Sequence, residues 1–453
     1  MSVKRTWTLM SALLVLAMVL GACAPAATPA PAAPAAQPTT PPAAPAAQPT
    51  AAPAQPTAAP AAKPTAAPTT AVATAVATTA AAASGGNFVF GLILVGPYND
   101  HGYSQAAYEG GKLAESQIPG AKMIYVDNVN SAAKPGVTVP QVVDDLISKG
   151  AKLVITNSDD FKDGTLEAAQ KHPDLPIINV SGDQAWKDGK DFKAPKNESN
   201  FFGKMEYGKM IAGCAAALST QTGKIGYLGP LINDETRRLV SSVYLGAKYC
   251  WTNYAKKDPK ALSFKVTWIG FWFNIPGQTL DPTKVADDFY NNGYDVVISG
   301  IDTTEAVVEA GKMAKAGKKV FAIPYDYKGA CTEAADVCLG VPYFNWGPAY
   351  VKAVGLVKDG KYAQYWDWYA PDWKDINSAT SAVGFVNGNA LSKDNATSVA
   401  TFVKGLGDGS INLFKGPLNF QDGSVFLKDG ETATDLQIWY LPQLLQGMEG
   451  ASK

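Results

Sequence analysis

Histidine is almost absent from this chain of 453 residues, which contains only His101 and His172. Two histidines are too few for a His-rich metal site, and they argue against a Ser-His-Asp triad. Neither sign of charge dominates, since 39 Lys and Arg stand against 40 Asp and Glu, for a net charge of −1. A nucleic-acid binder needs a basic face to displace counterions, so we expect no nucleic-acid partner.

Charge is also scarce between residues 24 and 84, where Lys63 is the one charged side chain. The same stretch holds 14 of the 31 prolines among Ala, Thr and Gln. Proline at this density prevents regular helices and sheets, and little apolar surface is available to bury. We therefore expect residues 23–86 to form a disordered, extended tether. The remaining 367 residues have a net charge of −4 and are long enough for two domains.

The first 22 residues have the pattern of a secretory signal peptide. Lys4 and Arg5 precede an apolar run, Leu9 to Leu20, that is too short to span a bilayer. The run ends in Leu20-Gly21-Ala22-Cys23, which resembles the lipobox of bacterial lipoproteins. This resemblance implies cleavage before Cys23, acylation of its thiol and anchoring to a cell membrane on the extracytoplasmic side. The alternative is an ordinary signal peptide with an incidental cysteine.

Four further cysteines would lie in an oxidising compartment, where an even number permits two disulfides. Cys331 and Cys338 are close enough in sequence to close a small loop, so we pair them first. Cys214 and Cys250 then pair by elimination, although both fall in predicted helices. The alternative is buried free thiols.

From residue 88 onward, short apolar runs alternate with longer amphipathic segments, which predicts an α/β fold with parallel sheets covered on both faces. The predicted strands are 88–95, 122–126, 152–156, 176–180, 224–228, 264–269, 295–299 and 319–323. The predicted helices are 103–117, 139–149, 164–172, 203–218, 235–254, 282–292 and 303–316.

Eight strands could form one sheet, but the spacing favours two lobes joined near residues 197–203. We assign 87–201, with part of 328–380, to the first lobe and 202–327, with about 381–453, to the second. A cleft between the lobes would then be the ligand site.

Ligands of open α/β sheets bind beyond the carboxyl ends of the strands, so we searched the residues after each strand. These positions combine aromatic rings with amides, hydroxyls and carboxylates, a mixture that suits a flat, polar, uncharged ligand. The candidates are Asn99, Asp100, Tyr103, Ser104, Asn157, Asp159, Phe271, Trp272, Asp302 and Asp326.

Several of these residues have a purely structural alternative. Asp302 with Glu305 forms a capping-box pattern, and Asn99 or Asp100 would serve as a turn residue. The aromatic run 271–273 would expose too much apolar area unless it is covered, either by ligand or by the neighbouring lobe.

Motifs distributed along residues 87–453 are similar to those of the basic membrane protein (BMP) family, the lipoprotein solute-binding components of ABC importers. No single motif is decisive, but their order along the chain together with the lipobox is specific. The motifs are Asn99-Asp100-x-x-Tyr103-Ser104, Tyr108-Glu109-Gly110, Gly223-Lys224-Ile225-Gly226-Tyr227, Leu245-Gly246-Ala247, Gly293-Tyr294-Asp295-Val296-Val297, Asn345-Trp346-Gly347-Pro348, Phe414-Lys415-Gly416-Pro417-Leu418, Gln437-Ile438-Trp439-Tyr440 and Gly447-Met448-Glu449-Gly450.

The resemblance implies a type I periplasmic-binding-protein fold whose two lobes close on a purine nucleoside or nucleobase. It places Tyr103 against the base, with Ser104 in place of the family's Asn, and Phe271–Trp272 on the opposite side. Asn157 or Asp159 would contact the base edge, and Asp326 would hold ribose hydroxyls.

In the family's nucleoside binders a lysine partners the acid that corresponds to Asp326. That lysine is expected near residues 343–345, but this chain has no lysine there. Phe344 or Trp346 would line the pocket there instead, so a nucleoside, a free base and another flat solute remain alternatives. A second departure is the aromatic insert 365–373, which either covers the cleft or packs a long loop, and packing is favoured.

The leading hypothesis is a lipid-anchored, monomeric receptor that passes a purine-like solute to an ABC permease. It needs no catalytic residue, cofactor or metal. The alternatives are a receptor for a sugar or another small polar solute, a surface nucleoside hydrolase that would use Asp159-Asp160, and a signalling receptor with the same clamp.

Overall fold

The computed structural model describes residues 87–453 of the chain. The predicted signal peptide (1–22), the lipidation site Cys23 and the tether (23–86) therefore lie outside the described residues. Among residues 87–453, no helix is both long and apolar enough to cross a membrane.

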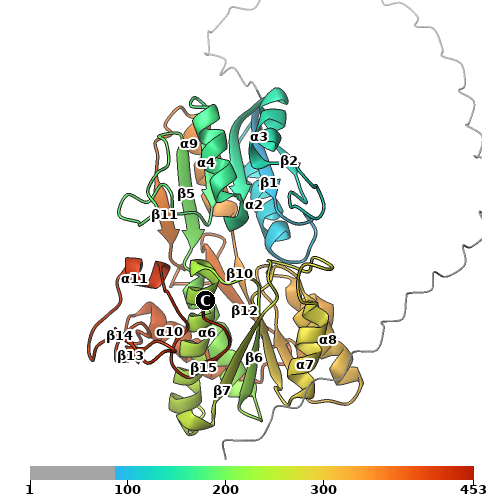
Figure 1. Cartoon of the computed structure of the whole chain (residues 1–453), viewed down its shortest axis with the longest axis vertical. Helices are drawn as coiled ribbons and strands as arrows, with labels where there is room; N and C mark the ends of the chain where they lie inside the picture. The colour runs from blue at the N-terminus through green and yellow to red at the C-terminus, as the bar shows by residue number, and fades with distance from the viewer. Residues whose placement is uncertain (1–86) are drawn as a thin grey trace, which may run out of the picture. The chain divides into compact units, whose positions relative to one another are not determined.

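A six-stranded parallel sheet forms the centre of the first lobe (Figure 1). The strand order is β11-β5-β4-β3-β1-β2. The strands are β1 (Phe88–Leu94), β2 (Ala121–Val126), β3 (Ala151–Asn157), β4 (Ile177–Val180), β5 (Glu198–Gly203) and β11 (Trp366–Tyr369). The helices are α2 (Tyr103–Gln117), α3 (Val139–Ser148), α4 (Lys162–Lys171) and α9 (Gly347–Lys358), with the 3-10 turn η1 (Asp159–Phe161).

Alternate side chains of the first sheet pack against different helices. Phe90 and Leu92 of β1 belong to the core beneath α2 and α9, whereas Ile93 belongs to the core beneath α3 and α4. Because both faces are covered, β1 is apolar along its length, as the sequence pattern predicts.

The second lobe is built on a five-stranded parallel sheet of order β15-β7-β6-β8-β9. Helices α5 and α6 contribute to one core, and α7 and α8 to another. The strands are β6 (Lys224–Gly229), β7 (Ser263–Trp268), β8 (Val296–Ser299), β9 (Phe321–Ile323) and β15 (Met448–Glu449). The helices are α5 (Met205–Ser219), α6 (Asp234–Asn253), α7 (Pro282–Asn291), α8 (Glu305–Lys315), α10 (Lys393–Gly407) and α11 (Asp435–Trp439), with the 3-10 segments η2 (Pro259–Ala261) and η3 (Ala330–Val337).

Three chain segments connect the lobes: β5 to α5, β10 to α9, and β11 to β12. Strands β10 (Gly340–Phe344) and β12 (Val383–Asn387) pair antiparallel, and so do β13 (Leu418–Asn419) and β14 (Val425–Leu427). Asn345 ties two of the connections together, because its backbone N–H donates to Ala382 O at 2.9 Å and its side-chain amide donates to Ser381 O at 3.0 Å.

The predicted α/β class, the alternation and the two parallel-sheet lobes are confirmed, and the alternative of a single sheet is wrong. Two strands of the first sheet, β5 and β11, are absent from the predicted set. The expected joint at 197–203 contains β5, whose buried polar residues Glu198, Ser199 and Asn200 conceal its strand character. The aromatic insert supplies β11, and its Trp366 ring stacks on Trp186 with centroids 4.1 Å apart, so in this structure it packs the edge of the first sheet.

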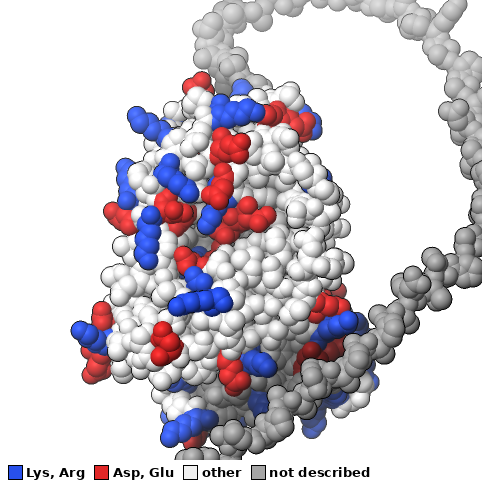
Figure 2. All heavy atoms as spheres, in the orientation of Figure 1, with Lys and Arg blue, Asp and Glu red and all other residues white. Residues whose placement is uncertain are grey.

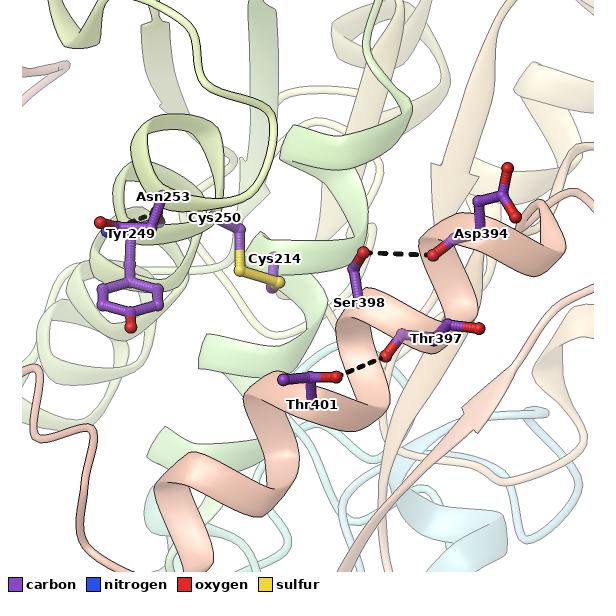
Figure 3. Close-up of a disulfide and its surroundings, with 8 residues drawn as sticks. All are labelled: Cys214, Tyr249, Cys250, Asn253, Asp394, Thr397, Ser398 and Thr401. Carbon is purple, nitrogen blue, oxygen red and sulfur yellow. Dashed lines mark hydrogen bonds between the residues drawn. A yellow bond between two sulfur atoms is a disulfide. The ribbon is translucent and has the colours of Figure 1, made fainter.

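Both cysteine pairs considered from the sequence are bonded. Cys214 of α5 joins Cys250 of α6, and both side chains are fully buried beside α10 (Figure 3). Cys331 and Cys338 close η3. The first disulfide spans 36 residues and links two long helices of one lobe, whereas the second spans 7 residues.

Removing the longer disulfide should destabilise the second lobe more than removing the shorter one. From loop length alone, Cys214→Ala/Cys250→Ala should lower the free energy of unfolding by about 4 kcal/mol, and Cys331→Ala/Cys338→Ala by about 2.5 kcal/mol. Urea unfolding of the two double variants measures the difference. Equal losses would show that loop entropy does not determine the contribution of the Cys214–Cys250 bond.

Candidate functional site

A cavity lies between the two lobes, with an empty volume of about 390 Å³ including its opening to solvent. Many of its residues directly follow strands, as Ser158 follows β3, Ser181 follows β4 and Gly300 follows β8. The first lobe contributes Tyr103, Ser158, Asp159 and Ser181, and the second contributes Tyr227, Glu235, Thr236, Leu239, Trp272, Gly300, Asp302, Tyr325 and Asp326. The cavity thus occupies the position expected for a ligand of facing parallel sheets.

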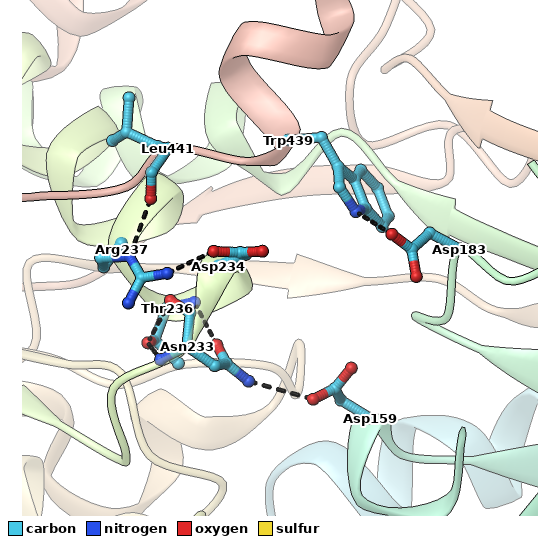
Figure 4. Close-up of polar contacts among 8 residues, drawn as sticks. All are labelled: Asp159, Asp183, Asn233, Asp234, Thr236, Arg237, Trp439 and Leu441. Atoms are coloured by element: carbon cyan, nitrogen blue, oxygen red, sulfur yellow. Dashed lines mark hydrogen bonds and ion pairs between the residues drawn. The ribbon is translucent and has the colours of Figure 1, made fainter. Parts of the chain in front are cut away.

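The lobes are closed around this cavity. Two hydrogen bonds cross from one lobe to the other. Tyr103 N donates to Asp302 O at 3.4 Å, and Asn233 Nδ2 donates to Asp159 Oδ2 at 3.0 Å (Figure 4). The backbones approach so closely that a Cβ atom at Gly102 would lie 1.7 Å from Asp302 O. Glycine is therefore required at position 102 for closure of this kind.

Two residues of the cavity combine an unusual backbone conformation with unpartnered polar atoms. Ser181 has φ of 88° and Asp326 has φ of 71°, in the left-handed region that costs free energy for residues other than glycine. Among the described residues, Ser181 Oγ and both carboxyl oxygens of Asp326 have no hydrogen-bond partner, although both side chains are buried. Strain and unpaired polar groups together are typical of a ligand-binding site.

Other polar atoms of the cavity are also buried without a partner. Within the part of the chain that the structure describes, Trp272 Nε1 donates no hydrogen bond and Glu235 Oε2 takes part in none. The cavity therefore offers an indole donor and carboxyl groups to a ligand that can pair with both.

Burial changes the charge of the acidic groups around the cavity. It raises the pKa of Asp302 and of Asp326 well above the usual range, and the charge of Asp326 raises the pKa of Asp302 further. Burial also raises the pKa of Glu235 to about 8. Burial thus favours the protonated form of these groups, in which a carboxyl can donate as well as accept a hydrogen bond.

A buried lysine behind the cavity was not found by sequence analysis. Lys209 of α5 donates to Ser299 O at 2.9 Å, and its ammonium lies 3.0 Å from the centroid of the Tyr325 ring. Burial lowers the pKa of Lys209 to about 7, while the carboxylate of Asp326 opposes the shift. Sequence analysis sought a lysine only near residues 343–345, whereas the fold supplies one from a helix more than 100 residues earlier.

The structure brings five of the twelve candidate residues together at the cavity. Tyr103 and Asp159 come from the first lobe, and Trp272, Asp302 and Asp326 come from the second. Tyr103 begins α2, and each of the other four lies in a loop or turn after a strand, which is the signal that identified them.

The other candidates from the first lobe do not line the cavity. Asp100 caps α2 by accepting from Gly102 N and Gln105 N at 2.9 Å, and burial raises its pKa to about 6. Ser104 Oγ accepts from Gly96 N at 3.0 Å. Asn157 Nδ2 donates to Tyr350 OH at 2.8 Å, and Asn99 is exposed.

The remaining aromatic candidates also lie outside the cavity. Phe271 packs against the α3 and α4 core of the first lobe, with its ring edge-to-face with Phe273 at 5.1 Å. This is the structural alternative considered from the sequence. Phe344 and Trp346 stack at 4.3 Å beside the connection between the lobes.

Sequence analysis missed eight residues of the cavity, for two different reasons. Ser181 follows a predicted strand and could have been chosen by the rule that found Asp326. Glu235 and Thr236 begin α6, and sequence alone assigns them to a helix start. The full set is Ser158, Ser181, Tyr227, Glu235, Thr236, Leu239, Gly300 and Tyr325.

Charge on the face drawn in Figure 2 does not point to a second site. Basic and acidic side chains are interspersed on the face in Figure 2, with neither sign forming a continuous field. Within residues 87–453, no three His, Cys, Asp or Glu side chains are grouped so that they could hold a metal ion.

Comparison with known proteins identifies relatives of this chain. The sequence model of a family described as "ABC transporter substrate-binding protein PnrA-like" matches residues 88–355, more than half of the chain. A purine-binding protein from Brucella abortus is 27% identical over 346 residues, which cover 76% of this chain and 88% of that protein.

Two solved structures share the fold. A solute-binding protein of an ABC transporter system from Conexibacter woesei matches with a TM-score of 0.53 at 16% identity, covering 72% of this chain and 98% of that chain. A solute-binding protein from Aeropyrum pernix K1 gives 0.54 at 13% identity, covering 74% and 93%. The predicted two-lobed architecture of type I periplasmic binding proteins is confirmed.

Stability of the ligand-free protein should depend on pH through Glu235. Between its ordinary pKa of 4.5 and about 8, the folded state binds more protons than the unfolded state, so the free energy of unfolding falls as pH rises. Glu235→Gln should reduce this loss between pH 5 and 8 by roughly 2 kcal/mol. Burial also raises the pKa of Glu198 to about 8, so part of the dependence should persist.

Thermal melting of wild-type protein and Glu235→Gln at several pH values measures the effect. Glu167→Gln, an exposed change on α4, is the control and should keep the wild-type slope. Parallel curves for wild type and Glu235→Gln would show that the Glu235 carboxyl is ionised in the folded protein.

Proposed function

This chain belongs to the PnrA-like family of ABC transporter substrate-binding proteins, and we propose that it captures a purine-like solute by lobe closure and delivers it to a membrane permease. The observation that carries this proposal is the set of unpartnered polar atoms on both sides of the interlobe cavity. Ser181 lies on the first lobe, while Trp272 and Asp326 lie on the second.

Closure buries these groups and removes their contacts with water, which costs free energy when no ligand replaces the lost hydrogen bonds. A ligand that bonds to both lobes provides the replacement only in the closed form. It therefore shifts the population toward closure by the difference between its affinities for the two forms. A permease that recognises the closed arrangement of the lobes would then accept loaded protein.

The composition of the cavity supports a flat heterocyclic ligand. Aromatic rings of Tyr103, Trp272, Tyr227 and Tyr325 line it together with the carboxyl groups of Asp159, Glu235, Asp302 and Asp326. Rings of this kind stack on a base, while the carboxyl groups pair with ring nitrogens, amino groups or hydroxyls. The Brucella relative is named for purine binding, which makes purines the first class to test.

One observation favours a sugar as the second candidate. Four carboxyl groups, from Asp159, Glu235, Asp302 and Asp326, line the cavity together with aromatic rings. Carboxyl groups around hydroxyl positions and an aromatic platform form the arrangement expected for a polyhydroxylated solute.

The proposal includes a lipid anchor. Cys23 would be acylated after removal of residues 1–22, and residues 23–86 would hold the two-lobed body away from the membrane on its extracytoplasmic side. The two disulfides suit such a location, because disulfides persist in oxidising compartments. We propose that the protein acts there as a monomer.

Ligand binding should raise the melting temperature. At a concentration of one hundred times Kd, a ligand stabilises the folded protein by about 2.7 kcal/mol. We expect this shift with purine bases or nucleosides and a smaller shift with glucose or galactose. Mass spectrometry of small molecules released from the denatured protein would identify the ligand carried through purification. If no purine shifts the melting point and a sugar does, the purine proposal is wrong and the sugar proposal stands.

Asp326→Asn tests the site itself. Asparagine tolerates the left-handed conformation of position 326 and keeps the side-chain shape, but it replaces a hydroxyl or an anionic oxygen with an amide. We expect at least a tenfold increase in Kd, measured by titration calorimetry, while the ligand-free melting point does not fall. The exposed change Asp429→Asn is the control. Unchanged affinity in Asp326→Asn would remove Asp326 from the binding site.

Cys23→Ser tests the anchor. Serine cannot form the thioether that carries the lipid, so we expect the variant in the soluble fraction and the wild-type protein in the membrane fraction of a fractionated bacterial host. Ser2→Ala, in the same segment, should remain with the membranes. Cys23→Ser protein that still sediments with membranes would contradict anchoring through this residue.

A further inference from the structure

A second hollow opens directly beside the interlobe cavity. It has an empty volume of about 660 Å³ and shares Asp159, Ser181 and Glu235 with the cavity, so the two hollows are direct neighbours. We call this second hollow the outer groove. It begins at the N-terminus of α6 and adds the basic side chains Lys162, Arg237 and Arg238.

The carboxylates of the outer groove already have partners within the protein (Figure 4). Asp159 Oδ2 accepts from Asn233 Nδ2 at 3.0 Å. Asp183 Oδ2 accepts from Trp439 Nε1 at 3.1 Å and from the hydroxyl of Tyr440 at 2.5 Å. A cationic ligand would therefore find these acceptors occupied.

The Asp234 carboxylate is likewise engaged, because it pairs with the guanidinium of Arg237. The same Arg237 donates through Nε to Leu441 O at 2.7 Å, which holds its planar group at the edge of the groove. This pair leaves no free acid at the start of α6 apart from Glu235.

The donors of the outer groove are less well satisfied. Arg238 is 1% exposed, and its Nε donates to Glu206 Oε1 at 2.8 Å, but its Nη2 has no partner among the described residues. Its guanidinium also lies 4.0 Å from the centroid of the Trp439 ring, which fixes the group in place. Ser181, which is 3% exposed, likewise keeps an unpartnered hydroxyl on the boundary between groove and cavity.

Further donors come from the start of α6 and from Glu235. The first backbone N–H groups of a helix have no partner within it, and the partial positive charge there favours an anion. Burial raises the pKa of Glu235 to about 8, so at neutral pH this carboxyl carries a proton that it can donate. Lys162 adds a cationic side chain to the groove, and the neighbouring charge of Asp159 raises the pKa of this lysine.

We propose that the outer groove binds an anionic group, a phosphate or a carboxylate, carried by the same solute whose ring occupies the interlobe cavity. The solute class is then a purine nucleotide or an acidic purine derivative. This inference rests on the proposed function, because it assigns the second half of the same site. Arg238 and Ser181 contact the anion, and Lys162 balances its charge.

Titration calorimetry with three probes tests the assignment: adenosine, adenosine 5′-monophosphate and inorganic phosphate. In the wild-type protein we expect the monophosphate to bind at least tenfold tighter than adenosine, and phosphate alone to bind weakly and to compete with the monophosphate only. Arg238→Gln with Glu206→Gln keeps a hydrogen-bonded buried pair while it removes the guanidinium. We expect this double variant to lose most of the tenfold ratio.

Lys162→Met is the second variant, in which Asp159 loses a nearby positive charge but keeps its hydrogen bond from Asn233. It should lower the ratio about threefold, whereas Ser241→Ala, a buried serine of α6 away from the groove, should keep the wild-type ratio. Using a ratio cancels any general loss of folded protein.

A wild-type ratio near one, or a ratio that survives the Arg238 change, would overturn the inference while leaving purine binding intact. If neither purine compound binds but phosphate binds and is lost in the Arg238 variant, the anion site stands and the purine proposal falls. If none of the three probes binds the wild-type protein, both are wrong.

Discussion

The central constraint on this structure is the burial of carboxyl groups between the two lobes without hydrogen-bond partners. Asp326 is fully buried with both oxygens unpartnered, and burial raises its pKa well above the usual range. An unpaired polar group in a closed interior costs roughly 1 to 3 kcal/mol. Burial of apolar side chains in the core of each lobe offsets this free-energy cost. A ligand that forms hydrogen bonds with the unpartnered groups would remove the cost and so favour binding. Protonation limits the penalty, since a neutral acid is cheaper to bury than a carboxylate.

The rest of the architecture holds these groups in place. Helices α5 and α6 are joined by a buried disulfide, and both contribute to the site, α5 through Lys209 and α6 through its first turn. Asn345 links two of the three connections between the lobes. On the other side, Trp439 of α11 reaches from the second lobe to Asp183 of the first. Contacts from separate parts of the chain therefore hold the two lobes together.

Much of the fold could be predicted from the sequence because parallel strands covered on both faces are apolar along their whole length. Helix α2 begins and ends at the predicted residues, Tyr103 and Gln117. The prediction failed where burial and polarity disagree. Strand β5 is fully buried but begins Glu-Ser-Asn. Three of the four residues of β11 are aromatic, and they lie in a segment that the sequence pattern presents as a loop insert.

The candidate site was only partly predictable for a related reason. The end of a strand can be recognised from the local sequence. Asp159, Trp272, Asp302 and Asp326 follow strands and could therefore be predicted as site residues. Glu235 and Lys209 lie on helices, where a charged residue has an ordinary local explanation, and only the packing of α5 and α6 across the second sheet brings them to the cavity. Phe271 shows the opposite error, because an aromatic residue in the right loop turned out to fill the gap between lobes.

The order in which the strands enter the two sheets has a consequence for how the protein is made. The first sheet receives its edge strand β11 at residues 366–369, after most of the second lobe has been synthesised, and the second sheet receives β15 only at residues 448–449. The first lobe cannot complete its sheet before residue 369 has been made, and the second cannot before residue 449, because each needs a segment encoded far downstream. If the chain is exported through a translocon from its N-terminus, this strand order would delay completion of each sheet until the late strand has crossed.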